Sequence, residues 1–229
     1  DKLNMNILEM TDSKPSIVTA NIDVYAHDIY LNPKIKDGNK VEDKMDAISL
    51  IEIINIFGLK DRQGPILDMG YGTGLMLHEL INKHGLQVDL LEGSAVLCEQ
   101  AKKEHGNNAC IHHSLFETFT TTKKYAHILA LHVLEHVDHP VQVLQQMMHA
   151  LSPRGRMLVF VPNAHSLHRR LAVQMKLQKQ LDSLSPKDHL VGHQRVFTPE
   201  TLKACALEAG FEIEHFFGLG LKTLPYSMM

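Results

Sequence analysis

The sequence predicts an α/β fold in which a doubly wound, mostly parallel sheet carries helices on both faces. Short apolar runs alternate with helical patterns through the middle of the 229-residue chain, which is typical of parallel sheets. One run, residues 66–69, leads directly into three alternating glycines, and the next run ends on a carboxylate, Glu92. The composition, 44% hydrophobic and 21% charged, is that of a globular protein and excludes disorder and collagen-like repeats.

Each element follows from its local pattern. A turn containing proline and glycine, residues 152–155, is expected to reverse the chain before the fifth strand, and Pro162 to stop that strand. Thr198 and Pro199 begin a helix, because threonine can cap a helix and proline suits its first turn. Strands are predicted at residues 65–69, 87–92, 108–113, 125–132, 156–161 and 211–217, and the other helices at 75–83, 95–104 and 141–151.

Two segments interrupt the alternation and define the domain organisation. The region before the first strand looks helical over residues 41–57. We therefore expect an N-terminal helical cap at residues 1–60 and a second unit at 61–229. That second unit carries an insertion at 164–197, which is far longer than the usual connection of about two to six residues.

The insertion contains an apolar stripe. Leu167, Leu171 and Met175 lie four residues apart, with basic residues elsewhere on the turn. The stripe predicts either a surface helix docked by its apolar side or one of three functional elements: an active-site lid, a dimer contact or a membrane-surface helix. The lid is favoured among these three, because ligands of open α/β sheets bind at the carboxyl ends of the strands.

The charge balance and the cysteines exclude several classes of protein. Twenty-three lysines and arginines face 26 acidic residues, whereas nucleic-acid binders usually carry a basic excess. Cys98, Cys110 and Cys205 form no disulfide framework and no CxxC pair, so a reducing, cytoplasmic compartment is expected. No apolar stretch approaches the roughly 20 residues of a membrane span, so no stable membrane insertion is expected.

The sharpest motif is the loop Asp-Met-Gly-Tyr-Gly-Thr-Gly at residues 68–74. Glycine at Gly70, Gly72 and Gly74 permits tight turning and lets a ligand lie against main-chain N–H groups at a helix start. No lysine follows to hold a triphosphate, so nucleotide hydrolysis is not expected. Glu92, 18 residues after Gly74, is placed to accept hydrogen bonds from both hydroxyls of a ribose. The loop and the acid together predict a site for a ribose-containing cofactor.

With these motifs in view, the sequence resembles the class I S-adenosylmethionine-dependent methyltransferases. The resemblance rests on ILDMGYGTG at 66–74, VDLLEGS at 88–94 and ILALHVLEHVDHP at 128–140. The last stretch is similar to the small-molecule subgroup that includes ubiquinone-biosynthesis O-methyltransferases. The resemblance covers residues 64–217 and implies a Rossmann-like sheet of seven strands, one of them reversed. No pattern for the last of these strands is evident before Met229.

The resemblance implies a binding site for S-adenosyl-L-methionine. Asp68 and the loop glycines would line the methionine and ribose groups, and Glu92 would hold the ribose hydroxyls. Leu131 and His132 would present backbone carbonyls to the methionine ammonium. The complete set of implied cofactor-binding residues is Asp68, Gly70, Tyr71, Gly72, Gly74, Glu92, Gly93, Ser114, Leu115, Leu131 and His132.

Two positions depart from the family pattern. Relatives often carry an acid after the third strand to contact the adenine amine, and Ser114 stands there instead. Its hydroxyl can still accept one hydrogen bond. Relatives also commonly carry aspartate at Ala126 or His127, at the start of the fourth strand.

The 16 histidines raise metal binding as a first idea. Residues 132–136 match HxxEH, the inverted zinc-peptidase pattern, which requires both histidines on one long helix. Here the motif leaves a strand and meets Pro140 almost at once, so no metal site is predicted. If the acceptor is a hydroxyl, a histidine base would speed its methylation. His136, just past the fourth strand, is the first candidate, followed by His189 and His193 in the insertion. For each histidine alone, a structural or solvent-facing role is at least as common.

The sequence therefore predicts methyl transfer from S-adenosylmethionine to a small-molecule acceptor, with O-methylation ahead of N-methylation. One rival is an NAD-type oxidoreductase, which the GxGxG spacing disfavours. The other is a cofactor-binding module without catalysis, to which the departures at Ser114 and Ala126 give some weight. Nucleic acid is not an expected partner, and a homodimer is left open. Tyr25 and Tyr30 are candidates to close over the cofactor, although packing in a core is the commoner use of tyrosine.

Overall fold

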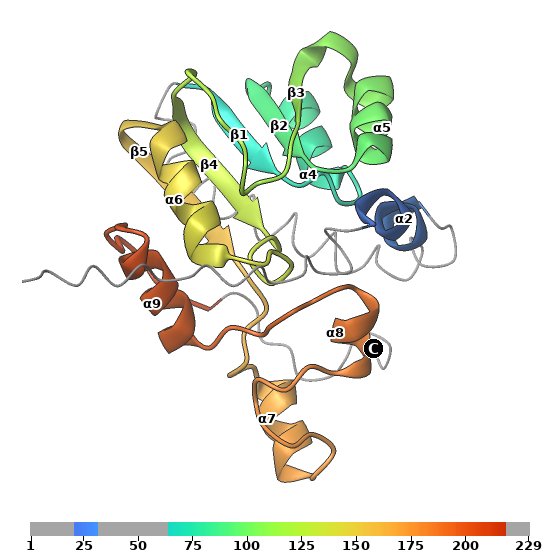
Figure 1. The fold of residues 1–229 in the computed structure, drawn as a ribbon, viewed down its shortest axis with the longest axis vertical. Coiled ribbons are helices and arrows are strands. Elements are labelled where there is room, and N and C mark those ends of the chain that lie inside the picture. Colours follow the sequence, from blue (N-terminus) through green and yellow to red (C-terminus); the bar gives the residue numbers. More distant parts are fainter. Residues whose placement is uncertain (1–20, 32–63, 219–229) are drawn as a thin grey trace, which may run out of the picture.

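A computed structural model of the protein describes residues 21–31 and 64–218 (Figure 1). Its described part confirms the α/β class: five parallel strands form one sheet in the order β3-β2-β1-β4-β5. This order places β1 at the centre and brings the carboxyl ends of β1, β2 and β4 together. The strands are β1 (Ile66–Met69), β2 (Val88–Glu92), β3 (Ala109–His113), β4 (Tyr125–Leu131) and β5 (Leu151–Phe160).

Helices cover both faces of the sheet (Figure 1). On one face, α4 runs directly into a π-helical turn, η2, and both pack beside α5. On the other face lie α6 and α9. A short 3₁₀ turn, η3, joins α5 to β3. The bounds are α4 (Leu75–His78), η2 (Glu79–Lys83), α5 (Ala95–His105), η3 (Gly106–Asn108), α6 (Pro140–Ala150) and α9 (Pro199–Glu208).

The two faces of the sheet bury two separate apolar clusters, because successive residues of a strand point to opposite sides. In β1, Leu67 and Met69 face the cluster under α6 and α9. Ile66 faces the cluster under α4 and α5. All four residues of β1 are buried, as expected for the central strand of a sheet covered on both faces.

Capping residues stand at the starts of α5 and α9, and one of them, Thr198, is the cap that the sequence predicts. Thr198 accepts a hydrogen bond from the N–H of Thr201, and the Thr201 hydroxyl in turn meets the backbone of Thr198. Ser94 caps α5 by accepting from the N–H of Leu97. The Ser94 hydroxyl also donates to Asp23, which ties the first described segment to the start of α5.

That segment consists of α2 (Ile22–Ala26) and a π-helical turn, η1 (His27–Leu31). It lies beside the amino end of α5 (Figure 1), and Ala26 is part of the apolar cluster under α4 and α5. These helical residues fall within the cap expected at residues 1–60. The helix predicted at 41–57 lies outside the described residues.

The sixth strand predicted at 211–217 is wrong. Residues 211–218 form no ladder with any strand of the described chain. An extended segment needs a neighbouring strand to satisfy its backbone groups, and among the described residues no strand lies beyond β5. This segment instead runs past α9, where Glu214 pairs with Arg156 and Lys203 lies 4.3 Å from the centre of the Phe216 ring.

The turn predicted at 152–155 is an irregularity within a longer strand. β5 begins at Leu151, and its register against β4 shifts between Tyr125 and His127. Arg154 has a φ of 63°, a left-handed conformation that lets the strand bulge and then rejoin the ladder. Proline and glycine here therefore interrupt the pairing without ending the strand.

The insertion extends beyond the carboxyl ends of the strands, as the lid interpretation requires (Figure 1). It contains α7 (Leu167–Gln174) and α8 (Pro186–Leu190). The apolar stripe of α7 is exposed, at 37% for Leu167, 43% for Leu171 and 65% for Met175. The interpretation of a surface helix docked by that stripe is therefore wrong: α7 instead buries Arg169. None of the described helices is long and apolar enough to cross a membrane.

Candidate functional site

The glycine loop turns in a way that only glycine adopts without strain. Gly70, Gly72 and Gly74 have φ angles of 84°, 53° and 79°, a region that residues with a Cβ rarely occupy. Gly74 is also sterically required, because a Cβ there would lie 2.5 Å from the Tyr71 hydroxyl. That hydroxyl donates to Glu104 on α5 at 2.6 Å, so the tyrosine is held in place from the far side.

Glu92 fastens this loop to the end of β2. One carboxylate oxygen accepts the N–H of Tyr71 at 2.8 Å, and the other accepts the N–H of Ser94 at 2.7 Å. The Gly70 N–H donates to the Leu91 carbonyl beside it. Each carboxylate oxygen has two lone-pair sites, so both oxygens can accept a further donor. This arrangement suits the two hydroxyls of a ribose and fits the role predicted for Glu92.

A second buried acid lies close to Glu92 at this end of the sheet. Asp68 on β1 is 2% exposed, and burial together with the charge of Glu92 raises the pKa of Asp68 to about 7. Burial also raises the pKa of Glu92, against the lowering effect of its backbone hydrogen bonds. When both carboxyl groups are ionised they repel each other, and a nearby cation would stabilise these ionised forms. The site is therefore complementary to a ribose-bearing ligand that is positively charged.

The residues predicted to contact the adenine of such a ligand lie next to Glu92. The Ser114 N–H donates to the Glu92 carbonyl at 3.0 Å, and the Ser114 hydroxyl donates to the Leu115 carbonyl at 3.1 Å. Gly93 lies between this strand end and α2: a Cβ on Gly93 would be 3.2 Å from Leu115 and 2.8 Å from Ile22. The lone pairs of the Ser114 hydroxyl remain able to accept, as the sequence analysis expects.

His132 marks a sharp turn immediately after β4. Its φ of 55° is unusual for a residue with a side chain, and its N–H donates to the Phe160 carbonyl at the end of β5. The imidazole Nδ1 lies 3.0 Å from Glu135 Oε1. Strained residues of this kind cluster at functional sites. The turn places Leu131 and His132 at the carboxyl edge, where their predicted role requires them.

Past this turn, a buried carboxylate is surrounded by histidines. Glu135 is completely buried, the His193 Nε2 lies 4.0 Å from its Oε1, and the His136 and His193 rings are 4.8 Å apart. Burial opposes ionisation of Glu135, but the His132 hydrogen bond and the neighbouring histidines outweigh it and lower its pKa. Burial lowers the pKa of His136 to about 4, so this ring is neutral at neutral pH.

Glu135 Oε2 and His136 Nδ1 are buried in this cluster without a hydrogen-bond partner among the described residues. Buried polar atoms are rarely left this way. Ligand atoms of Glu135, His136 and His193 lie within 4.8 Å of one another, so the cluster can hold either a proton or a divalent cation.

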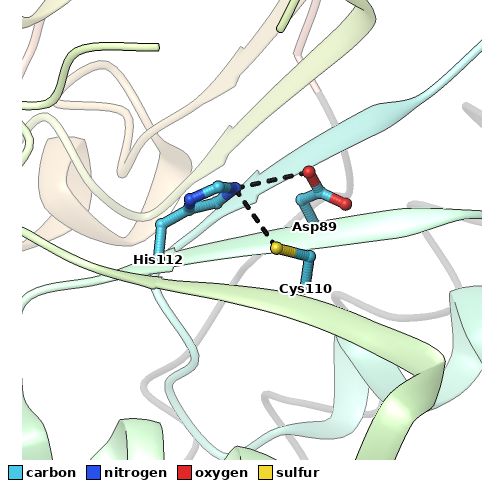
Figure 2. A group of neighbouring side chains, drawn as sticks. All are labelled: Asp89, Cys110 and His112. Atoms are coloured by element: carbon cyan, nitrogen blue, oxygen red, sulfur yellow. Dashed lines mark hydrogen bonds and ion pairs between the residues drawn. The ribbon is translucent and has the colours of Figure 1, made fainter.

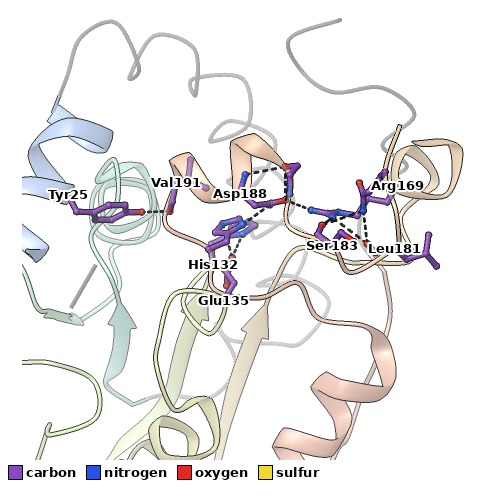
Figure 3. A network of polar contacts seen from close by, with 11 residues as sticks. Tyr25, His132, Glu135, Arg169, Leu181, Ser183, Asp188 and Val191 are labelled. Carbon is purple, nitrogen blue, oxygen red and sulfur yellow. Dashed lines mark hydrogen bonds and ion pairs between the residues drawn. The ribbon is translucent and has the colours of Figure 1, made fainter. Parts of the chain in front are cut away.

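A chain of polar contacts within the insertion, which runs through Arg169 and Asp188 (Figure 3), orients His193. Its Nδ1 lies 2.8 Å from Asp188 Oδ1, which leaves Nε2 directed toward Glu135. Asp188 is held in turn by Arg169 Nη2 at 2.7 Å and by Ser185, whose N–H and hydroxyl both donate to Asp188. Burial opposes ionisation of Asp188, but the hydrogen bonds from His193, Ser185 and Arg169 keep its pKa well below the usual range.

Two consecutive polar residues attach the insertion to the loop after β4. Gln194 donates its N–H to the Glu135 carbonyl at 2.9 Å and its side-chain amide to Asp138 at 2.8 Å. Arg195 donates to the carbonyls of Leu134, Val137 and Asp138. Because Gln194 and Arg195 directly follow His193, their hydrogen bonds to this loop hold His193 against Glu135.

Two tyrosines from the first described segment connect the glycine loop to the histidine cluster. The ring of Tyr30 lies 3.8 Å from the position of a Cβ on Gly72, and the centres of the Tyr25 and Tyr30 rings are 5.9 Å apart. Tyr25 lies 6.3 Å from the His136 ring and donates its hydroxyl to the Val191 carbonyl at 2.7 Å (Figure 3). The cofactor loop, the cluster and the insertion thus form one continuous site.

The structure brings together His136 and His193 of the three predicted base candidates. His189 is exposed on α8, and no side-chain contact of the described chain joins it to the cluster. Asp188 and Arg169 were missed by the sequence analysis. The Ser185–Asp188 capping box is a recognisable local pattern, but the partner that Asp188 binds across the insertion is not.

Comparisons with known proteins identify the family and the fold. The family described as a methyltransferase domain matches residues 43–216. No curated protein matches the chain. Among solved structures, the plantazolicin methyltransferase BamL, in complex with a desmethylPZN analog and SAH, is similar with a TM-score of 0.59 and 18% identity over 84% of this chain and 73% of its own. A candidate sarcosine dimethylglycine methyltransferase from Galdieria sulphuraria gives a TM-score of 0.53 and 21% identity over 72% of this chain and 59% of its own. These likenesses show the fold.

The steric requirement at Gly74 is testable by comparison with Gly85. Both have a positive φ, but a Cβ at Gly85 would meet nothing within 4 Å. We expect Gly85→Ala to lower the free energy of unfolding by about 1 kcal/mol, and Gly74→Ala to lower it by about 2–4 kcal/mol because the clash with Tyr71 adds to the strain. Urea denaturation measures both. Equal losses would contradict the steric account.

Proposed function

Because the chain belongs to the methyltransferase-domain family, a family of S-adenosylmethionine-dependent enzymes, we propose that it methylates a small-molecule acceptor at a hydroxyl group. The observation that supports a hydroxyl is the oriented His193, held by Asp188 beside the buried Glu135. A neutral amine can accept a methyl group without prior loss of a proton, whereas a hydroxyl is a poor nucleophile until a base removes its proton. An oriented histidine–carboxylate pair is the device that meets this need.

The residues of the loop fit S-adenosylmethionine on two counts. Glu92 offers both carboxylate oxygens at the place expected for ribose hydroxyls, and the buried pair of Asp68 and Glu92 favours a positively charged ligand. When bound, the cofactor supplies a methyl group on a sulfonium, which is already a good leaving group. The protein therefore contributes mainly orientation of donor and acceptor and removal of the acceptor's proton.

His193 is the better base of the two clustered histidines. His136 is buried with a pKa of about 4, so it binds a proton weakly at neutral pH. His193 has its Nδ1 on Asp188, so its Nε2 can take the acceptor's proton while Asp188 and Glu135 stabilise the resulting imidazolium. As the candidate base, we therefore place His193 ahead of His136, whereas the sequence alone places His136 first.

A second role for the cluster is supported by its unpartnered atoms. Glu135 Oε2 and His136 Nδ1, together with His193, form a two-histidine, one-carboxylate donor set that suits a divalent transition metal. A cation there would bind the acceptor oxygen and lower the pKa of its hydroxyl. Activity lost on chelation and restored by a divalent ion would assign this role in place of the base.

The raised pKa of Asp68 predicts how cofactor binding depends on pH. Because a cationic ligand favours the ionised carboxylate, affinity for S-adenosylmethionine should rise with pH through about 7 and weaken below it by up to about tenfold per pH unit. Stability should change in the opposite sense: the folded protein retains the Asp68 proton between about pH 4 and 7, so the free energy of unfolding falls as pH rises across that window.

Isothermal calorimetry at several pH values measures the affinity. Asp68→Asn should bind more weakly at pH 8 and lose most of the pH dependence, while keeping a native circular dichroism spectrum. Failure of the wild-type protein to bind either S-adenosylmethionine or S-adenosylhomocysteine would overturn the cofactor assignment altogether.

The proposed base is tested by comparing two neighbouring histidines. A panel of hydroxylated and aminated small molecules, scored by release of S-adenosylhomocysteine, identifies an acceptor. With it, His193→Ala should lower kcat by about 10²–10⁴-fold, whereas His189→Ala should change kcat less than about twofold. Asp188→Asn should lower kcat with little change in cofactor affinity, because Asp188 orients His193 and does not contact the glycine loop. Wild-type kcat in His193→Ala, or acceptance of amines alone, would contradict the proposal.

A further inference from the structure

A second group of metal-ligating side chains lies at the outer edge of the sheet, on β2 and β3 (Figure 2). Asp89 and Cys110 are register partners on the two strands, and His112 follows two residues later on β3. Residues at this spacing point to the same face of a sheet, and Figure 2 shows the three side chains converging there. Asp89 is the second residue of β2, so the group lies toward the amino end of the strand, away from Glu92 and the glycine loop.

The donor atoms are spaced like the ligands of a tetrahedral metal ion. His112 Nε2 lies 3.3 Å from Asp89 Oδ2 and 3.8 Å from Cys110 Sγ. Around a zinc ion, with Zn–N and Zn–O of about 2.0 Å and Zn–S of about 2.3 Å, such donors are separated by about 3.3 and 3.5 Å. Donor atoms of all three residues lie within 4.8 Å of one another. Only small side-chain movements are needed for them to share one ion.

A positive charge already occupies this place. Lys123 Nζ lies 2.6 Å from Asp89 Oδ2, and the Tyr125 hydroxyl donates to the same oxygen at 2.9 Å. The Asp89 side chain is 9% exposed and that of Lys123 is 44% exposed. The carboxylate is therefore fixed, whereas the ammonium borders solvent and can leave. Lys123 is thus a built-in competitor for any cation that binds here.

We propose that Asp89, Cys110 and His112 bind a divalent ion of the zinc class, which displaces the Lys123 ammonium into solvent. The Cys110 thiol gives up its proton to solvent, neutral His112 offers the Nε2 lone pair, and Asp89 is already ionised. The two anionic ligands balance the 2+ charge, and water completes the tetrahedron. The thiolate and imidazole favour zinc over magnesium or calcium, which take oxygen ligands. This site is independent of the methyl-transfer reaction.

Cobalt(II) is a suitable probe, because a thiolate ligand produces an intense sulfur-to-cobalt charge-transfer absorption in the near ultraviolet. The reduced full-length chain is titrated with cobalt(II) and then with zinc(II). We expect one equivalent to produce the band and zinc to bleach it. The Glu135, His136 and His193 cluster contains no sulfur, so cobalt bound there does not contribute to this band.

Three variants locate the site. Cys110→Ser should abolish the band, whereas Cys205→Ser, a matched change of another free cysteine, should retain it. Lys123→Met should tighten cobalt binding by at least about tenfold, because the competing charge is removed. Circular dichroism confirms that each variant is folded. Absence of the band in the wild-type protein, its survival in Cys110→Ser, or unchanged affinity in Lys123→Met would overturn the proposal and leave Lys123 as the resident partner of Asp89.

Discussion

The hydrogen bonds of the Glu92 carboxylate are the contacts on which the cofactor end of the molecule depends. They join the glycine loop after β1 to the start of α5, because one oxygen holds the N–H of Tyr71 and the other that of Ser94. A carboxylate buried at this depth is costly unless it is hydrogen-bonded, and the loop can supply the Tyr71 donor only in the left-handed conformation that its glycines permit. The acid and the glycines therefore require one another, and the resulting geometry leaves carboxylate oxygens that can accept the hydroxyls of a ribose.

The opposite side of the site depends on a second buried carboxylate, Glu135, and on the way the insertion is attached. Gln194 and Arg195 bind the carbonyls of the loop after β4, where a parallel sheet leaves backbone groups without a strand partner. This attachment sets His193 against Glu135, while Arg169 and Asp188 fix the orientation of its ring. The insertion is thus held by polar contacts at its C-terminal end, and the apolar stripe of α7 remains exposed.

Charge distinguishes the two halves of the site. Asp68 and Glu92 form an acidic end that resists ionisation until a cation binds, whereas the pKa of Glu135 is lowered and the His136 ring beside it is neutral. The first environment suits a sulfonium cofactor, and the second is the one in which we propose that a proton is accepted. Tyr25 and Tyr30 lie between the two halves, and burial raises the pKa of Tyr25, so its hydroxyl stays a donor to the insertion.

The sequence by itself determined the parallel α/β sheet, four of the five described strands within one or two residues at each end, and the residues of the cofactor loop. These features follow from local patterns: apolar runs, glycine spacing, and capping residues such as Thr198. Tertiary structure decided which segments pair and which side chains meet, because local patterns carry no information about distant partners. Residues 211–217 have the composition of a strand but no strand to pair with among the described residues. His189 and His193 lie four residues apart, and the sequence alone does not distinguish them. Only His193 lies against Glu135, because Asp188 binds its ring and the N–H of Gln194 binds the Glu135 carbonyl. The assembly of His193, Glu135 and the glycine loop therefore required contacts between segments more than 50 residues apart, which no local spacing records.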